Sequence, residues 1–89
     1  MSVVVIVFGP DPPCVRCQAV KKNVENVAAK VFKTEKVRVE VRRANIASKE
    51  TIQKYGILVS PALAINGVVK FMGRIPSEAE IEKEVRKTK

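Results

Sequence analysis

The sequence contains no histidine, no tryptophan and only two cysteines. A tetrahedral zinc site needs about four soft ligands, so a zinc finger formed by one chain is excluded. Long apolar runs are absent too, because the longest wholly apolar stretch covers only Val3 to Phe8, whereas a membrane-spanning helix needs roughly 20 residues. We therefore expect neither a zinc module nor a transmembrane protein, and no membrane partner.

The chain is short. Its 89 residues are fewer than those of an average domain of about 100 to 150 residues, so residues 1–89 are predicted to form a single domain. With 46% hydrophobic and 29% charged residues, the composition is typical of a folded globular domain. The stretch Met1 to Ile6 has neither the basic region nor the cleavage site of a secretory signal. This predicts a mature start and a cytoplasmic location.

Positive charge is in excess. Seventeen lysines and arginines against nine acidic residues give a net charge of +8. Such a surface attracts nucleic acids, anionic lipids or acidic proteins without distinguishing them. Only four residues are aromatic, and most of them fall inside apolar segments, so the stacking platforms of single-strand binders are not evident. We do not expect nucleic acid as a partner and interpret the charge as a solubilising surface; recruitment of an acidic partner protein is the functional alternative.

Hydrophobic periodicity predicts two strands and a long helix in the first half of the chain. Val3 to Phe8 is an unbroken, mostly β-branched run, typical of a central strand covered on both faces. Lys36 to Arg43 alternates between apolar and charged residues, as expected of a strand at a sheet edge. Between them, from Cys14 onward, valines recur with helical spacing and predict one buried helix face: Val20, Val24, Val27 and Val31.

A short helix is predicted next. Ser48 is a suitable N-cap for a helix that runs through Lys54, and Gly56 is suited to end it. Ile52 and Tyr55 are expected to face inward.

A β-hairpin follows. Asn66-Gly67 is typical of a two-residue type I′ turn, and it joins two predicted strands, Pro61 to Ile65 and Val68 to Met72. This dipeptide is interpreted as a turn and not as a functional site.

A last helix completes the predicted order β-α-β-α-β-β-α. Ser77 to Glu80 has the spacing of a capping box, and Ile81 and Val85 give the helix an apolar stripe. The initial strand, helix and strand require a right-handed parallel crossover, and the hairpin must join the same sheet in antiparallel orientation. The fold class is therefore α/β, with a mixed four-stranded sheet flanked by helices.

Cys14 and Cys17 are the residues best suited to chemistry. They stand between the first strand and the first helix, and a helix N-terminus carries unpaired N–H groups and about half a positive charge, which favour a thiolate. Cys14 receives most of that field, and Cys17 lies nearly one turn away, close enough to attack a disulfide formed at Cys14. The residues between them, Val15 and Arg16, are predicted to tune the redox potential, because a cation near the sulfur favours the thiolate.

A second reading of the two cysteines is metal binding. A pair with this spacing after a first strand also suits Cu(I), or an iron–sulfur cluster shared between two chains. Metallochaperones with β-α-β-β-α-β order resemble this start, but they need a strand where Ser77 to Lys87 predicts a helix. The element order thus favours the redox interpretation, which is also the usual one for such a motif in a cytosolic βαβ unit.

Ser60-Pro61 marks the start of the hairpin. Proline is tolerated at the first position of a strand on packing grounds alone, and only about 5% of X-Pro bonds are cis in folded proteins. Sequence physics by itself therefore favours a trans bond and a purely structural proline.

Three motifs in order resemble the small redox-active disulfide proteins of prokaryotes, which have the thioredoxin fold and the size of glutaredoxins. These motifs are Phe8-Gly9-Pro10 before the cysteine pair, the segment from Tyr55 to Gly67, and Gly73 to Ser77. The resemblance covers nearly the whole chain. It implies a thioredoxin-like three-layer sandwich and thiol–disulfide exchange as the activity.

The resemblance also implies residue roles. Cys14 would be the nucleophile and Cys17 the resolving thiol, and Pro61 would be a cis-proline that, with backbone groups of Ser60, holds an extended substrate. No cofactor and no metal are expected. The implied partners are proteins with disulfides as substrates, and a reductase or a low-molecular-weight thiol as electron donor.

The chain departs from the family pattern beside the cysteines. Pro13 precedes Cys14 and Val15 follows it, where members of the family commonly have glycine and then proline. The buried acid and the tryptophan of the larger thioredoxins are not recognisable either, since Asp11 is the only aspartate. The redox potential and the route of proton transfer are therefore expected to differ from those of the family.

Overall fold

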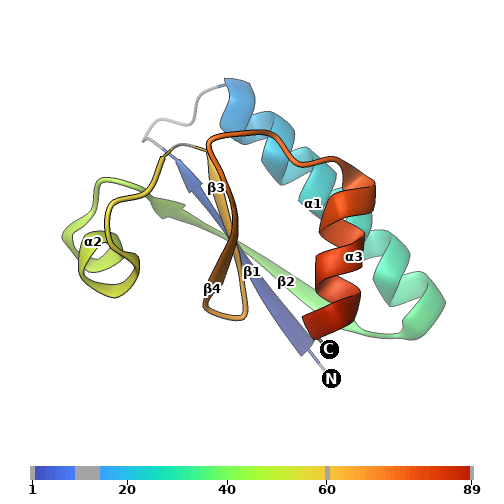
Figure 1. The fold of residues 1–89 in the computed structure, drawn as a ribbon. Coiled ribbons are helices and arrows are strands. Elements are labelled where there is room, and N and C mark those ends of the chain that lie inside the picture. Colours follow the sequence, from blue (N-terminus) through green and yellow to red (C-terminus); the bar gives the residue numbers. More distant parts are fainter. Residues whose placement is uncertain (1, 10–14, 60, 89) are drawn as a thin grey trace.

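The computed structural model describes residues 2–9, 15–59 and 61–88, and its elements follow the predicted order. The helices are α1 (Val15–Glu35), α2 (Lys49–Tyr55) and α3 (Glu78–Thr88). The strands are β1 (Ser2–Gly9), β2 (Arg38–Asn45), β3 (Ala62–Ile65) and β4 (Val68–Met72). In Figure 1 the strands form a middle layer, with α2 on one side and with α1 and α3 on the other.

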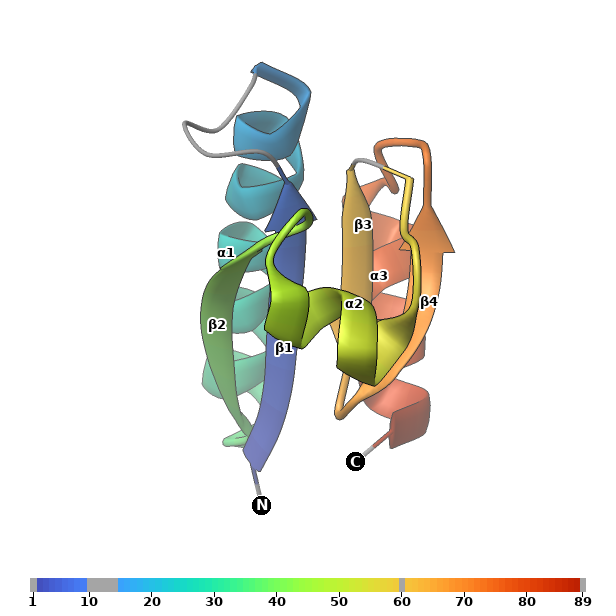
Figure 2. The same cartoon turned by 90° about the vertical axis from the view of Figure 1, so that its left-hand side faces the viewer.

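The sheet is mixed and four-stranded, as predicted. Its strand order is β2-β1-β3-β4. Strand β1 pairs in parallel with β2 and in antiparallel fashion with β3, which pairs in turn with β4. The central position of the first strand, the edge position of β2 and the antiparallel hairpin are thus confirmed. Figure 2 shows α2 in front of the strands and the two longer helices behind them.

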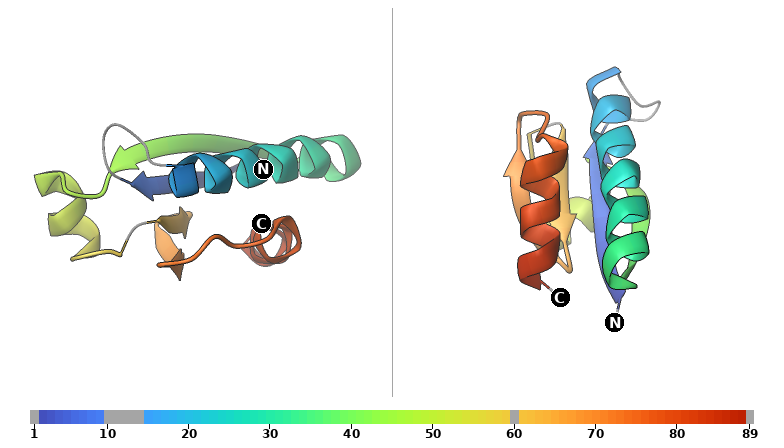
Figure 3. Two further views of the ribbon diagram at one scale, coloured as in Figure 1. Left: turned by 90° about the horizontal axis from the view of Figure 1, so that it is seen from above. Right: turned by 90° about the vertical axis from the view of Figure 1, so that its right-hand side faces the viewer.

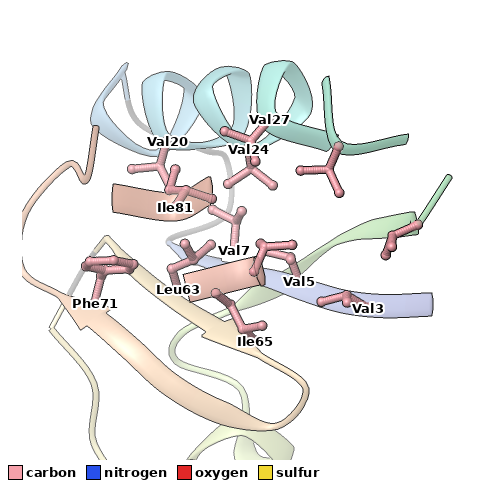
Figure 4. Packing of buried hydrophobic residues seen from close by; sticks show 13 residues of the cluster. Val3, Val5, Val7, Val20, Val24, Val27, Leu63, Ile65, Phe71 and Ile81 are labelled. Atoms are coloured by element: carbon pink, nitrogen blue, oxygen red, sulfur yellow. The ribbon is translucent and has the colours of Figure 1, made fainter. Parts of the chain in front are cut away.

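The main core lies between the sheet and the two longer helices, which run side by side in Figure 3. Alternate residues of β1, namely Val3, Val5 and Val7, point to this side, and none is more than 1% exposed. Figure 4 shows them packed against α1 and α3. The four valines predicted for the inner face of α1 are all buried, and so are Ile81 and Val85 of α3.

The opposite face of the sheet carries a smaller core. Phe8 is buried there with Ala62 and Ala64, and the ring of Tyr55 meets Phe8 edge to face at 5.0 Å between centroids. Since β1 contributes buried residues to both cores, it is covered on both faces, as the apolar run predicted.

Helix α2 is capped as predicted, but it turns a different face toward the sheet than the one predicted. Ser48 is the N-cap and Gly56 the C-cap. However, Ile52 is 45% exposed, so the prediction that it faces inward is wrong. Thr51 is buried in its place, because its hydroxyl donates to the carbonyl of Asn45 at 2.8 Å and so fixes which face of the helix meets the sheet.

Strand β2 is shifted by two residues from the predicted range of Lys36 to Arg43. Lys36 has a left-handed backbone, with φ of 59°. Its N–H donates to the carbonyl of Phe32 at 2.9 Å and thereby closes the last turn of α1. The strand therefore begins only at Arg38.

The two turn motifs are confirmed. Asn66 and Gly67 have φ of 49° and 83°, as a type I′ turn requires. At the start of α3, the N–H of Glu80 donates to the Ser77 hydroxyl at 3.2 Å, and the N–H of Ser77 donates to the Glu80 carboxylate at 3.1 Å. This reciprocal pair is a capping box.

Candidate active site

The sequence-predicted site residues belong to the end of the sheet where β1 ends and α1 begins. The described ones are Val15, Arg16, Cys17 and Pro61. Cys14 and Ser60 lie outside the described residues, and with them the peptide bond that joins Ser60 to Pro61. In Figure 1 the start of α1, the start of β3 and the segment after β4 lie at the same end of the molecule.

The side chains in the first turn of α1 differ sharply in solvent exposure. Val15 is 80% exposed, whereas Cys17 is only 3% exposed. Cys17 lies on the inner face of the helix, three residues before the buried Val20. A thiol held there is screened from reagents in solution and is directed toward the interior of its own domain.

Two hydrogen bonds connect the start of α1 to the start of the hairpin. The guanidinium of Arg16 donates to the carbonyl of Gly73 at 3.2 Å. The N–H of Gly73 donates to the carbonyl of Pro61 at 2.9 Å. Gly73 thus joins two predicted site residues that are far apart in the sequence, and the residues around the cysteine motif and the proline form one constellation.

Gly73 itself was not predicted to belong to the site. Its φ of 79° is left-handed, and this conformation favours glycine. A Cβ there would lie in ordinary van der Waals contact with Cγ1 of Val59, at 3.4 Å. The available signal was a glycine placed directly after a predicted strand, but its contact with Pro61 depends on the pairing of β3 with β4.

Exposed apolar side chains surround this constellation. Val15, Val59, Met72 and Ile75 are between 39% and 80% exposed. Val59 faces Gly73, which directly follows Met72. Large exposed apolar residues gathered at one place favour contact with another molecule. Sequence periodicity did not identify them as a group, because they come from three separate segments.

A cavity of about 90 Å³ lies on another side of Cys17. It is lined by residues of β1, α1 and β2: Val7, Gly9, Cys17, Gln18, Lys21 and Arg43. The sequence did not indicate this cavity, since it depends on which residue of β2 lies opposite Val7. The register places Arg43 there.

An ion pair supports the segment after Gly73. The Arg74 guanidinium donates to both carboxylate oxygens of Glu80, at 3.0 and 2.6 Å. These bonds, together with the N–H of Ser77, lower the pKa of Glu80 to about 2, and they raise the pKa of Arg74. The connection between β4 and α3 is therefore fixed by charge-assisted bonds.

The described residues contain neither a cluster of metal ligands nor a helix that could span a membrane. In the ranges 2–9, 15–59 and 61–88, no three His, Cys, Asp or Glu residues come together in a way that could hold a metal ion. None of the helices in these ranges has the length and apolar character needed to cross a membrane.

Comparison with protein families gives a match over almost the entire chain. Residues 1–86 match the family model described as a thioredoxin domain. A thioredoxin from Methanocaldococcus jannaschii is 36% identical over 83 residues, which cover 92% of this chain and 93% of the relative. A thioredoxin from Methanothermobacter thermautotrophicus is 29% identical over 70 residues, or 79% of this chain and 83% of the relative.

Solved structures share the fold at lower identity. The oxidised thioredoxin from Plasmodium falciparum superposes with a TM-score of 0.64 at 15% identity, covering 97% of this chain and 80% of that one. Human ERp44 superposes with a TM-score of 0.60 at 21% identity, covering 96% of this chain and 25% of that one. The predicted three-layer thioredoxin-like fold is thereby confirmed.

Proposed function

Because this chain belongs to the thioredoxin family, we propose that it is a thiol–disulfide oxidoreductase that works through Cys14 and Cys17. The observation that carries the proposal is the position of Cys17, buried in the first turn of α1 at the end of the central strand. A thiol so placed can react with a disulfide only if that disulfide includes a neighbouring sulfur, and Cys14 is the other cysteine of the chain.

The proposed reaction has two exchange steps. The Cys14 thiolate attacks one sulfur of a substrate disulfide, forms a mixed disulfide with it and releases the other substrate sulfur as a thiolate. The Cys17 thiolate then attacks the Cys14 sulfur, so that a Cys14–Cys17 disulfide forms and the second substrate thiolate leaves. Two electrons pass to the substrate, and solvent protonates its thiolates. The helix N-terminus and Arg16 favour the Cys14 thiolate.

Substrate contact is assigned to the constellation around Gly73. We expect an extended substrate segment to hydrogen-bond with the backbone of Ser60, to pack against Pro61 and to cover Val15 and Val59. The bond from Gly73 to Pro61 and the bond from Arg16 to Gly73 support this assignment, because they hold both sides of the site at a fixed separation. Extended segments are typically bound through main-chain hydrogen bonds.

The partners follow from the chemistry. The substrates are disulfide-containing proteins, and the chain must be reduced again by a reductase or a low-molecular-weight thiol. No cofactor is needed, since both electrons reside on the cysteine sulfurs. Cu(I) binding, or an iron–sulfur cluster shared between two chains, would use the same cysteine pair and stays the alternative.

The proposal is tested by insulin-disulfide reduction with dithiothreitol, thioredoxin reductase or glutathione as the electron donor. We expect the protein to accelerate reduction with at least one of the three donors, and the Cys14→Ser variant to remain at the uncatalysed rate. Activity with the reductase alone would assign a thioredoxin-like electron supply, and activity with glutathione alone a glutaredoxin-like one. A wild-type rate equal to that of Cys14→Ser with every donor would contradict the proposal.

A further inference from the structure

Arg16 is an exposed cation at the candidate active site. It follows Cys14 by two residues in the sequence and belongs to the first turn of α1. Its guanidinium donates to the carbonyl of Gly73 at 3.2 Å. The charged end of the side chain therefore lies between the first turn of α1 and the segment that follows β4, two parts of the chain that meet at one end of the molecule in Figure 1.

The bond to Gly73 leaves most of the guanidinium available to a ligand. An arginine presents several N–H donors in a planar fork, and in the described part of the chain only Gly73 accepts from Arg16. No carboxylate in the ranges 2–9, 15–59 and 61–88 forms an ion pair with it. The first turn of α1 contains no acidic residue, and Glu80 pairs with Arg74. These residues thus leave the charge of Arg16 without a counterion.

A guanidinium held in this way is suited to bind a carboxylate. Arginine forms bidentate, charge-assisted hydrogen bonds with carboxylates, and a side chain that is already held by one bond loses less conformational freedom on binding. Val15 is its neighbour in the chain and Val59 lies against Gly73, and both valines are more than half exposed. The charge is therefore bordered by apolar surface, which fits an acidic residue within an otherwise apolar segment.

From this arrangement we propose that Arg16 selects substrate proteins that carry an aspartate or a glutamate beside the reactive disulfide. The inference rests on the proposed thiol–disulfide exchange and deepens it by naming a class of substrate. The substrate sulfur must reach Cys14, and an extended segment advances about 3.3 Å per residue. A carboxylate one or two positions from the substrate cysteine therefore comes within reach of Arg16, which takes no part in bond making itself.

Competition between two peptide disulfides measures this selectivity directly. The peptides share the same apolar residues and differ only beside the cysteine, where one has glutamates and the other has lysines. Reduced protein is added in limiting amount, the reaction is stopped with acid, and mass spectrometry gives the ratio of the two reduced peptides. The same competition with limiting dithiothreitol gives the intrinsic reactivity of the two disulfides, by which that ratio is divided.

We expect the wild-type protein to prefer the acidic peptide, and Arg16→Gln to lower this preference about fivefold, the upper range for one exposed charge pair. The loss of the bond to Gly73, or a changed reactivity of Cys14, would slow both peptides alike and cancel in the ratio. Added salt should weaken the wild-type preference, because it screens the attraction. An unchanged preference in Arg16→Gln, or one that is insensitive to salt in the wild type, would overturn the proposal.

Arg38→Gln is the matched control. It removes the same charge from the protein, but Arg38 is exposed at the start of β2, opposite Ser2 at the start of β1, whereas the candidate active site lies where β1 ends. This variant measures the effect of net charge alone, and its preference should stay within about 1.5-fold of that of the wild type. A loss as large as that of Arg16→Gln would assign the preference to the charge of the whole protein and so contradict a specific role of Arg16.

Oxidised glutathione distinguishes the source of the carboxylate. It carries carboxylates near its disulfide but has no further chain to cover Val15 and Val59, so it should be reduced more slowly than the acidic peptide. Faster reduction of glutathione would contradict selection of a protein segment. If the wild type reduces neither peptide while dithiothreitol reduces both, the proposed function fails. If the wild type and Arg16→Gln reduce both peptides with equal selectivity, only the role of Arg16 fails.

Discussion

At the residue scale, Gly73 connects the two halves of the site. It combines a left-handed backbone with hydrogen bonds to both Arg16 and Pro61. None of these properties involves a side chain of its own. Replacing it should therefore have two separate consequences: backbone strain, which lowers stability, and displacement of its partners, which lowers activity.

Gly73→Ala tests that separation. We expect it to lower the free energy of unfolding by about 1–2 kcal/mol, the cost of a non-glycine residue in the left-handed region. Exchange activity should fall roughly three- to tenfold, because a small displacement of positioning groups is costly for a reaction. Denaturant unfolding and insulin reduction provide the two measurements.

The control for this prediction is Gly67→Ala. Gly67 also has a positive φ, of 83°, but nothing lies within 4 Å of its Cβ position, and it belongs to the turn between β3 and β4. Its replacement should cost similar stability and leave exchange activity unchanged. If both variants lose activity equally, Gly73 has no specific role in the site.

At the element scale, α3 is anchored to the segment after β4 by Glu80. Its carboxylate accepts from Arg74 and from the N–H of Ser77, and its pKa is lowered to about 2. Because this pKa is below its ordinary value of 4.5, folding favours the ionised form. The contribution to stability is therefore full above that value and is lost as the pH falls toward 2.

Glu80→Gln should remove this pH dependence. The variant is expected to be less stable than wild type at neutral pH, and the difference should shrink as the pH falls from about 4.5 to about 2. Denaturant unfolding at a series of pH values measures it, with Glu25→Gln on the exposed face of α1 as the control. A difference between wild type and Glu80→Gln that stays constant over this range would contradict the assignment.

Helices, strands and turns were the features that the sequence predicted best. Valine spacing predicted the buried face of α1, and local motifs predicted the Asn66-Gly67 turn and the cap at Ser77, since each depends on neighbouring residues only. Ile52 was misplaced because the orientation of α2 follows from the hydrogen bond between Thr51 and the carbonyl of Asn45, six residues earlier at the end of β2. The spacing of apolar residues carries no information about such a bond.

The site was predictable only in part for the same reason. The cysteine motif and Pro61 were identified by motif, and Gly73 connects Arg16 of that motif to Pro61. The cavity at Cys17 was not predictable, because it needs the register that sets Arg43 opposite Val7. Strand register is a long-range property, and a shift of one residue would turn Arg43 to the other face.

At the scale of the whole molecule, charge is distributed unevenly. The acidic residues of α3 are engaged: Glu80 with Arg74, and Glu82 with Lys30. By contrast, Lys21, Lys22 and Arg38 on α1 and β2 have no acidic partner among the residues that the structure describes. These unpaired cations contribute to the net charge of +8. Recruitment of an acidic partner protein stays a prediction.

The measurement that tests the central claim most directly is trapping of the intermediate. The Cys17→Ser variant, mixed with a disulfide substrate, should accumulate a mixed disulfide at Cys14, because the thiol that resolves it is missing. Mass spectrometry under non-reducing conditions identifies the linked residue, and Cys14→Ser should yield no such adduct, since Cys17 is buried. Equal trapping by both variants, or none by Cys17→Ser, would contradict the account.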